Sequence, residues 1–387
     1  MNMLLDTNKA TKTASLVDAI TNRLEFYKAL SSREYTLAKK FEEIQANKNK
    51  YSQYDLDAVK DMIFNPEDPS EVMNIKPKLI YVDSTNKSGM KIFQILRTFC
   101  TAHENVNRIG RALRYLVIDE VTGKYIGIIH VCSDMALLSK RNKYLGIDKQ
   151  INARDWECLK NIASCYTLVP MQPFGFNYAG GKLITLLAGS EIIERDWNRK
   201  YKDKLVGLST TSLYGSFSQY TNLKHWKKTG ELQSQVSYKL PDNEYELAKD
   251  WLKDIEPEKH FDFFERKHAS GKGPYIRDNK NKFHQYVFKK LGFKKADYEC
   301  SHARGTFFCS LFNETPEFLQ GKMDYESLTR RYDNSVESLT AMWKGRYAKK
   351  RLEKLEQREN LKSEILFYDA MMRSENWEEA KSRYLSI

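Results

Sequence analysis

ALRYLVIDE at residues 112–120 and YIGIIHVCSD at residues 125–134 are the two apolar runs that decide the fold of this 387-residue chain. The four residues between them, VTGK, include Gly123, which can adopt the positive φ that a tight turn requires. Two apolar runs joined by such a short turn predict a β-hairpin.

Strand and helix signals alternate after this hairpin. SCYTLVP at residues 164–170 and LVGLSTTS at residues 205–212 are strand candidates, and a stretch with leucines three and four residues apart separates them. A strand, a loop, a helix and a second strand in this order predict an α/β protein with a mixed central sheet.

Helical patterns flank this centre. Residues 13–49 predict two helices with a break at Ser31 and Ser32, and a long helical region extends over residues 325–385. We therefore expect helical N- and C-terminal extensions around the sheet. The expected division is a helical N-terminal extension at 1–75, an α/β core at 76–240, an α+β continuation at 241–322 and a basic helical C-terminal region at 323–387.

Composition restricts the class of protein. The chain has 63 Lys and Arg residues against 51 Asp and Glu residues, and the resulting net charge of +12 favours a phosphate-bearing partner. The sequence has no apolar run of about 18 residues and no signal-peptide pattern, so we expect no membrane association. Six cysteines without a CxxC pair indicate reduced thiols, a cytoplasmic protein and no zinc site.

A glycine-containing loop, QPFGFNYAGGK at residues 172–182, opens the predicted helix. Glycines let a backbone approach a ligand closely, and free amides at a helix N-terminus attract phosphate. Gly175, Gly180, Gly181 and Lys182 are therefore candidate cofactor-binding residues. The alternative is a tight turn between strand and helix that needs glycine for purely steric reasons.

Polar side chains near the strand ends are candidate catalytic residues. Ser212 ends a run of four hydroxyl residues, and Tyr220 follows it as a possible general acid. Asp134 and Arg141 follow the hairpin closely. The alternative is that the hydroxyls and Tyr220 belong to a packed strand and core.

Two basic features are candidate nucleic-acid contacts. Arg304 precedes a predicted strand and could grip a phosphate, or form a structural ion pair. A basic stretch interleaved with Trp343 and Tyr347 has the composition of a surface that follows a nucleic-acid backbone, or of a solvated helix face. Its cations are Lys344, Arg346, Lys349, Lys350 and Arg351.

Several motifs, taken in order, carry a resemblance: GRALRYLVIDEVTGKYIGIIHVCSD, RNKYLGI, GGKLITLL, DWNRKY, LVGLSTTSLYGSFSQY and HARGTFFCSLFNETPEFLQG. Over residues 76–321 they resemble the family that includes the core protein of Druantia anti-phage systems and many phage proteins. At the level of the fold, the element order is similar to the acyltransferase superfamily of histone-acetyltransferase-like enzymes. That superfamily includes the phage Mu Mom protein, which modifies adenine in DNA.

The second resemblance implies roles for particular residues. Gly175, Gly180 and Gly181 would line a loop for the pyrophosphate of acyl-CoA, and Tyr220 would protonate the leaving thiolate. The loop departs from the usual acyltransferase pattern, because Asn177 or Lys182 stands at a defining place in either register.

The leading hypothesis is a phage-type DNA-modifying transferase with an acyltransferase-like sheet. It adds a small group to a base, with Tyr220 as acid and Asp134, Arg141 and Ser212 around the acceptor. Such an enzyme has to extrude its target base from the duplex. The alternative is a non-catalytic nucleic-acid-binding protein of phage defence or counter-defence. Either hypothesis makes DNA a more favoured partner than RNA, and neither the donor, the acceptor base nor the oligomeric state follows from the sequence.

Overall fold

The computed structural model describes residues 2–102, 110–212, 219–267, 279–355, 361 and 367–386. The chain divides into two compact units, each built from two separate segments. The core unit comprises Thr36–Leu232 and Ala303–Ile387, and the helical unit comprises Met1–Tyr35 and Gln233–His302. These units cut across the four segments expected from the sequence, whose boundaries stay a prediction.

A mixed seven-stranded sheet, counted over the described residues, is the centre of the fold. Its strands are β1 (Pro77–Val82), β2 (Ala112–Asp119), β3 (Tyr125–Ser133), β4 (Ile162–Pro170), β5 (Gly207–Thr211), β6 (Trp226–Ser237) and β7 (Glu299–Ser310). They lie in the order β1-β2-β3-β4-β5-β7-β6. Antiparallel pairing joins β1 to β2, β2 to β3, β3 to β4 and β5 to β7, and β4 and β5 are parallel. The predicted α/β class with a mixed sheet is confirmed.

The predicted hairpin is present as β2 and β3. Tyr115 lies opposite Ile129 in the antiparallel register. Gly123 closes the turn with a φ of 71°, and its amide donates to the carbonyl oxygen of Asp119 at 2.8 Å. Because this backbone conformation is strained for any residue with a Cβ atom, glycine is the residue that the turn requires.

The crossover from β4 to β5 confirms the strand–helix–strand prediction. Ile162 lies opposite Gly207 in the parallel pair. A parallel pair needs a long connection, which the chain supplies with helices. These are α7 (Phe174–Asn177), α8 (Gly180–Leu187) and α9 (Glu191–Tyr201).

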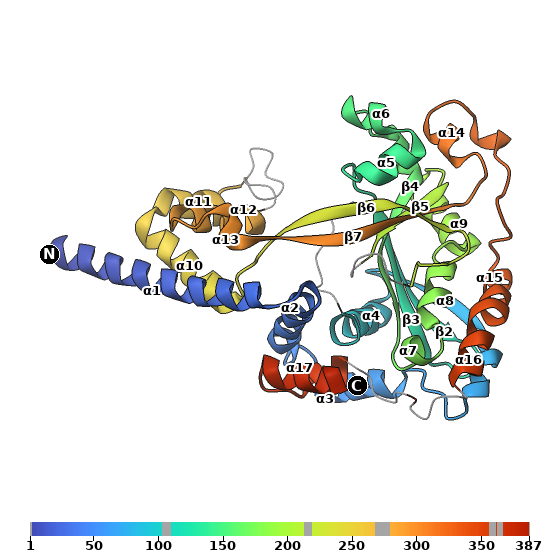
Figure 1. Cartoon of the computed structure of the whole chain (residues 1–387), viewed down its shortest axis with the longest axis horizontal. Helices are drawn as coiled ribbons and strands as arrows, with labels where there is room; N and C mark the ends of the chain where they lie inside the picture. The colour runs from blue at the N-terminus through green and yellow to red at the C-terminus, as the bar shows by residue number, and fades with distance from the viewer. Residues whose placement is uncertain are drawn as a thin grey trace. The chain divides into compact units, whose positions relative to one another are not determined.

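Helices cover both faces of β3. A Cβ atom on Gly127 would lie 2.7 Å from Ile184 Cγ1 of α8, so this face of the strand carries α8. On the other face the ring of His130 contacts that of Phe93, which belongs to α4 (Lys87–Phe99), with 6.3 Å between the ring centres. Figure 1 shows α4 and α8 on opposite sides of the sheet.

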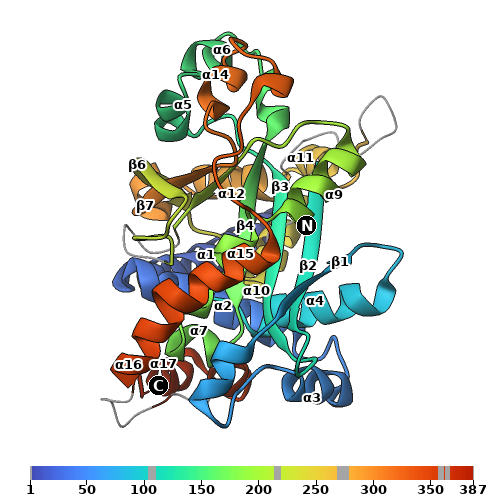
Figure 2. The ribbon, with the colours of Figure 1, turned by 90° about the vertical axis from the view of Figure 1, so that its right-hand side faces the viewer.

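The C-terminal helices lie on the α8 face. There α15 (Val336–Trp343) contacts α8, and Figure 2 shows α15 and α16 (Lys349–Leu355) in front of the sheet. The predicted long helical region is divided into short segments. Besides α15 and α16, these are the 3-10 turn Tyr325–Ser327, the π-helical turns Lys344–Ala348 and Phe367–Met372, and α17 (Trp377–Ser386).

Shorter helices complete the core unit. They are α3 (Gln53–Asp61), α5 (Ser139–Leu145), α6 (Asp148–Asn152), α14 (Thr315–Leu319) and the 3-10 turns Pro69–Asn74 and Glu157–Asn161.

The helical unit has its own hydrophobic core. It holds α1 (Asn2–Ala29), α10 (Asp242–Ile255), α11 (Pro257–Phe264), α12 (Asn279–Lys290) and α13 (Lys295–Tyr298). Arg23 of α1 pairs with Glu244 of α10 at 2.7 Å, and the Trp251 indole donates to Thr13 at 2.9 Å. The helix α2 (Ser32–Asn47) begins at the predicted serine break after α1.

Candidate functional site

The N-terminus of α8 is where the sequence predicts a phosphate-binding loop. Ala179 precedes the helix with a left-handed backbone (φ 57°), and Gly180 begins it. A Cβ atom on Gly180 would lie 2.5 Å from Cδ1 of Phe174. One on Gly181 would lie 2.6 Å from Oε1 of Gln219. The two glycines therefore make room for side chains of this protein.

Lys182, the predicted cation of the loop, also has protein partners. Its Nζ donates to the carbonyl oxygens of Thr221 at 2.6 Å and Gln219 at 3.3 Å. It lies 5.2 Å from the centre of the Tyr347 ring. Burial lowers the pKa of this ammonium group. Lys182 therefore fixes the segment at 219–221 against α8.

Acyl-CoA, the cofactor that the fold resemblance implies, needs helix-terminal amides that face open space. Phe174 and Gln219 occupy the space beside the first two residues of α8. A Cβ atom on Gly175 would lie 2.6 Å from Pro170 Cγ and 2.7 Å from Gln172 Nε2. The residues of this loop therefore do not fit the pyrophosphate of acyl-CoA.

Tyr220, the predicted general acid, lies in the core. Its ring packs against Trp226 and Phe307, with 5.6 Å and 5.2 Å between ring centres. Its hydroxyl lies 3.5 Å from Oγ1 of Thr210. Burial raises the pKa of Tyr220 to about 12. This environment suits a structural role better than proton transfer to a leaving group.

Asp134 and Arg141, predicted to lie around the acceptor, contact each other in the structure. Their side chains form an ion pair with exposed fractions of 0% and 1%. Ser209 Oγ donates to the same carboxylate at 2.7 Å. Ser212 lies elsewhere, since its Oγ accepts from the Gly305 amide of β7 at 2.8 Å. The hydroxyl that joins the pair is therefore Ser209, three residues from the one predicted.

The predicted nucleic-acid contacts differ in where they point. Arg351 is directed inward, where its Nε donates to the Asn177 carbonyl at 2.8 Å and its Nη2 to the Phe176 carbonyl at 3.0 Å. Lys349 and Lys350, by contrast, are exposed at the start of α16.

Two other predicted contacts are half-buried. Arg304 lies on β7. Lys344 begins the π-helical turn after α15, and burial lowers the pKa of its ammonium group.

A set of cations lies around His225, of which Arg346 was predicted as a nucleic-acid contact and Lys224 and Arg331 were not. The imidazole stacks on the Tyr332 ring, with 3.6 Å between ring centres and an interplanar angle of 14°. Burial, followed by the positive charges of Lys224, Arg331 and Arg346, lowers the pKa of His225 to about 4. We call Lys224, His225, Arg331 and Arg346 the basic cluster.

Tyr347 brings two parts of this cluster together. Its hydroxyl accepts from the Lys224 amide at 2.9 Å and donates to the Asn222 carbonyl at 3.2 Å. The turn has left-handed backbone at Asn222 (φ 56°) and His225 (φ 73°). Because Arg346 precedes Tyr347 in the chain, these bonds place Arg346 beside the turn that carries Lys224.

The cations of the basic cluster face solvent. Lys224, Arg331 and Arg346 are exposed, and within the described part of the chain none of them pairs with a carboxylate. A sequence signal for them exists, since each cation of the cluster directly precedes an aromatic ring. The three dipeptides are Lys224-His225, Arg331-Tyr332 and Arg346-Tyr347.

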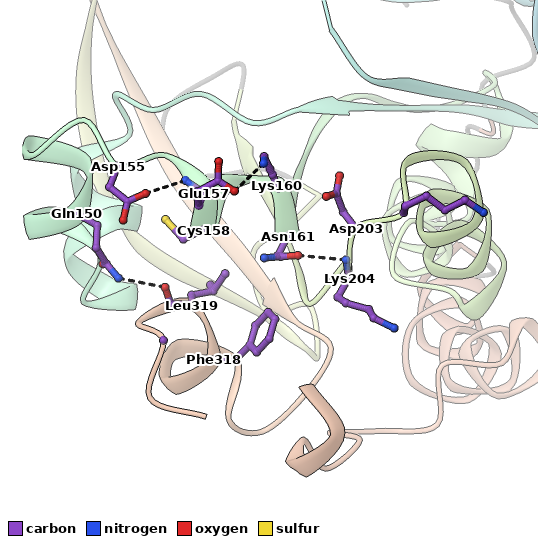
Figure 3. Close-up of a pocket in the computed structure, with 12 residues that line it drawn as sticks. Gln150, Asp155, Glu157, Cys158, Lys160, Asn161, Asp203, Lys204, Phe318 and Leu319 are labelled. Carbon is purple, nitrogen blue, oxygen red and sulfur yellow. Dashed lines mark hydrogen bonds and ion pairs between the residues drawn. The ribbon is translucent and has the colours of Figure 1, made fainter. Parts of the chain in front are cut away.

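A hollow of about 420 Å³ lies beside the 3-10 turn before β4 (Figure 3). Its walls carry both signs of charge. Lys160 pairs with Glu157 at 2.6 Å, and Asp203 pairs with Arg111. The Lys204 ammonium lies 4.6 Å from the centre of the Tyr325 ring. Because much of its charge is already paired, we expect this hollow to attract an anion less strongly than the basic cluster does.

The described residues include no helix with the length and hydrophobicity that crossing a bilayer demands. They also hold no group of three or more His, Cys, Asp or Glu side chains placed to bind a metal ion.

Comparison with known proteins identifies the family. The family model of Druantia protein DruA matches residues 22–321. The Druantia protein DruA of Escherichia coli (strain UMEA 4076-1) is 29% identical over 241 residues, which cover 57% of this chain and 56% of that protein. This chain thus spans little more than half the length of that relative. No solved structure matches. Since the family model covers most of the sequence, the chain belongs to the DruA family.

Proposed function

We propose that this chain is a nucleic-acid-binding component of anti-phage defence, with DNA preferred over RNA and the basic cluster as a phosphate-binding surface. Membership of the DruA family supports the defence role. The observation that carries the binding role is that the His225–Tyr332 ring stack and the Tyr347 hydroxyl bring three exposed cations together, without a carboxylate partner in the described residues.

The physical reason is electrostatic. Like charges held close together destabilise a folded protein unless an anion neutralises them. A phosphate backbone supplies such anions in a row, and their neutralisation releases counterions. Arg331 and Arg346 add planar guanidinium groups that can bind phosphate in a bidentate manner. Lys349 and Lys350, exposed on the next turn of helix, extend the surface.

A DNA-base transferase is the competing function. It needs a donor site at the N-terminus of α8 and a reachable proton on Tyr220. The Phe174 ring beside Gly180 and the burial of Tyr220 support the binding function over this one.

Salt-dependent binding tests the proposal. The test variant is Lys224→Ala/Arg331→Ala/Arg346→Ala, measured by fluorescence anisotropy with labelled duplex DNA and with RNA of the same sequence. The control is Lys78→Ala/Lys160→Ala/Lys228→Ala, which removes three exposed cations that each pair with a carboxylate. Both variants lose the same net charge, so the comparison isolates position from total charge.

The plot of log affinity against log salt has a negative slope, to which each phosphate contact contributes about 0.9. We expect the test variant to make this slope less steep by about 2 to 3. The control should change the slope by less than about 1. Equal losses in the two variants would attribute binding to net charge and overturn the assigned site. Absence of salt-sensitive binding in the wild-type chain would overturn the function itself.

The mass of nucleosides separates the two functions. We expect DNA from cells that express the chain to have unaltered nucleoside masses. A new mass that disappears with Tyr220→Phe would establish the transferase in place of the binding protein.

Phage plating tests the defence role. The triple Lys224, Arg331 and Arg346 variant, expressed in the native genomic context, should restore plaque formation on a host that the wild-type chain protects. Equal protection by wild type and variant would separate the basic cluster from defence.

A further inference from the structure

The connection from β3 to β4, residues 134–161, exposes three large apolar side chains. Leu137 is 90% exposed, Trp156 54% and Tyr144 37%. Leu137 lies just before α5, and Tyr144 lies near the end of that helix. We call residues 134–161 the β3–β4 connection. Leu138, the next residue after Leu137, is buried. The exposure of Leu137 is therefore specific to that side chain and does not extend to the whole turn.

The backbone before Leu137 is held by buried side chains. Arg141, in its ion pair with Asp134, donates from Nη2 to the Met135 carbonyl at 2.7 Å. Asn142 Nδ2 donates to the Ala136 carbonyl at 2.8 Å. Two consecutive carbonyls are thus fixed from α5. Leu137 therefore lies on a turn that is already held in place, so little conformational entropy of the backbone is lost when a partner binds.

Cations surround these apolar side chains. Lys140, Lys143, Lys149 and Arg154 are exposed and form no ion pair within the described residues. The acidic side chains of the same surface are Asp148, Asp155 and Glu157, and Glu157 already pairs with Lys160. With four unpaired cations against the two carboxylates of Asp148 and Asp155, the net unpaired charge of the connection is positive.

Two cations lie close to Leu137 in the chain. Residues three and four apart on a helix are neighbours on its surface, so Lys140, Lys143 and Tyr144 of α5 share a face. Leu137 lies outside the helix, two residues before its first residue Ser139, and is exposed next to the N-terminus of α5. Proteins that bind the minor groove contact DNA with Lys and Arg and often insert an apolar side chain, Leu among them, between base steps.

We propose that the β3–β4 connection inserts Leu137 between stacked bases of a nucleic acid, with Lys140 and Lys143 on the adjoining phosphates. This inference rests on the proposed nucleic-acid binding. It adds a second part of the core unit, separate from the basic cluster, that contacts bases as well as phosphates. Asp134 and Arg141, expected from the sequence to be catalytic, are positioning residues for Leu137.

The experiment uses short duplex hairpins that carry 2-aminopurine at a TA step, where unstacking costs least. Fluorescence of this base rises when it leaves the stack. The test variant is Leu137→Ala, and the control is Leu247→Ala. The control removes an identical side chain, 54% exposed, from α10 of the helical unit. A third variant, Lys140→Ala/Lys143→Ala, tests the phosphate contacts.

We expect wild type and Leu247→Ala to raise the fluorescence several-fold, and Leu137→Ala to abolish most of the rise while it keeps the salt slope. Lys140→Ala/Lys143→Ala should lower the salt slope by about 2. Binding without a fluorescence rise, or an equal rise in both leucine variants, would contradict the insertion of Leu137. Either result would leave the proposed phosphate binding by the basic cluster unaffected. Absence of any nucleic-acid binding would overturn both, and would leave the connection as a protein-binding surface.

Discussion

Two groups of cations in the core unit have opposite environments. Lys182 and Arg351 donate to backbone carbonyls around α7 and α8, and Arg141 pairs with a buried carboxylate. The basic cluster instead holds its cations in solvent without acidic partners among the described residues. The sequence singled out all three, Lys182 through the glycine loop, Arg141 through its place after the hairpin and Arg351 through the basic stretch. The comparison teaches that the availability of a cation depends on its partners in the fold more than on its neighbours in the chain.

The largest expected effect on stability concerns the buried ion pair of Arg141, one of the cations that bind other parts of the protein. Asp134→Ala leaves the Arg141 charge buried without its partner, so the free energy of unfolding should fall by about 3–5 kcal/mol. Urea unfolding measures this loss. The double variant Asp134→Leu/Arg141→Met should lose clearly less, because it removes both charges. A loss in the double variant that matches the single one would show that the pair is not the cause.

The second prediction sharpens the contrast within α16. Arg351→Ala removes charged hydrogen bonds to two carbonyls and should cost about 1.5–3 kcal/mol of unfolding free energy. Lys350→Ala, at an exposed position, should stay within about 0.5 kcal/mol of wild type. DNA affinity should follow the reverse order. If Arg351→Ala weakened DNA binding more than Lys350→Ala at full stability, the division into inward and outward cations would fail.

The third prediction concerns the filled helix terminus. Gly180→Ala forces a methyl group toward the Phe174 ring and should destabilise the protein by about 1–3 kcal/mol. Gly345→Ala is a matched control, because a Cβ atom there meets nothing within 4 Å and the residue has no positive φ. A helical glycine replaced in open space should gain up to about 1 kcal/mol. Equal thermal shifts in both variants would contradict the packing at Gly180.

The smallest effect is the pH dependence from His225. Its pKa is lowered to about 4, so between that value and the ordinary value near 6.5 the unfolded chain binds more protons than the folded one. This contribution to stability is present above about pH 6.5 and is lost as the pH falls toward 4. Wild type should therefore lose more stability than His225→Gln between pH 7.5 and 5. Parallel pH profiles for the two proteins would show that neither burial nor the neighbouring cations lower the pKa of His225.

The sequence predicts those parts of the fold that depend on local pattern. The hairpin at Gly123, the strand–helix–strand unit through α8 and the break at Ser32 all follow from short-range periodicity and turn residues, and each is present. The pairing of β5 with β7 is not local. Gly207 lies opposite Ser310, more than 100 residues later in the chain, and no pattern within either strand announces that partner.

The candidate site was predicted less completely for the same reason. Asp134 and Arg141 were singled out because they lie close together in the sequence, and their ion pair joins residues only seven positions apart. Arg331 and Arg346 lie more than 100 residues from Lys224 in the sequence. They come near it only because the C-terminal segments pack against the core unit and the Tyr347 hydroxyl bonds to the turn that carries Lys224. A cation placed directly before an aromatic residue, repeated three times, was the available clue.

The discontinuous helical unit has a consequence for synthesis on the ribosome. Leu16, Ile20, Leu24 and Tyr27 of α1 are buried in a core whose other members, apart from Tyr35, come from residues 233–302. At about 5–20 residues per second, translation delivers those partners about 10–55 seconds after α1 has been made. During that interval the apolar stripe of α1 faces water or a chaperone. The yield of folded chain therefore depends on what shields this helix while the core unit is still being translated.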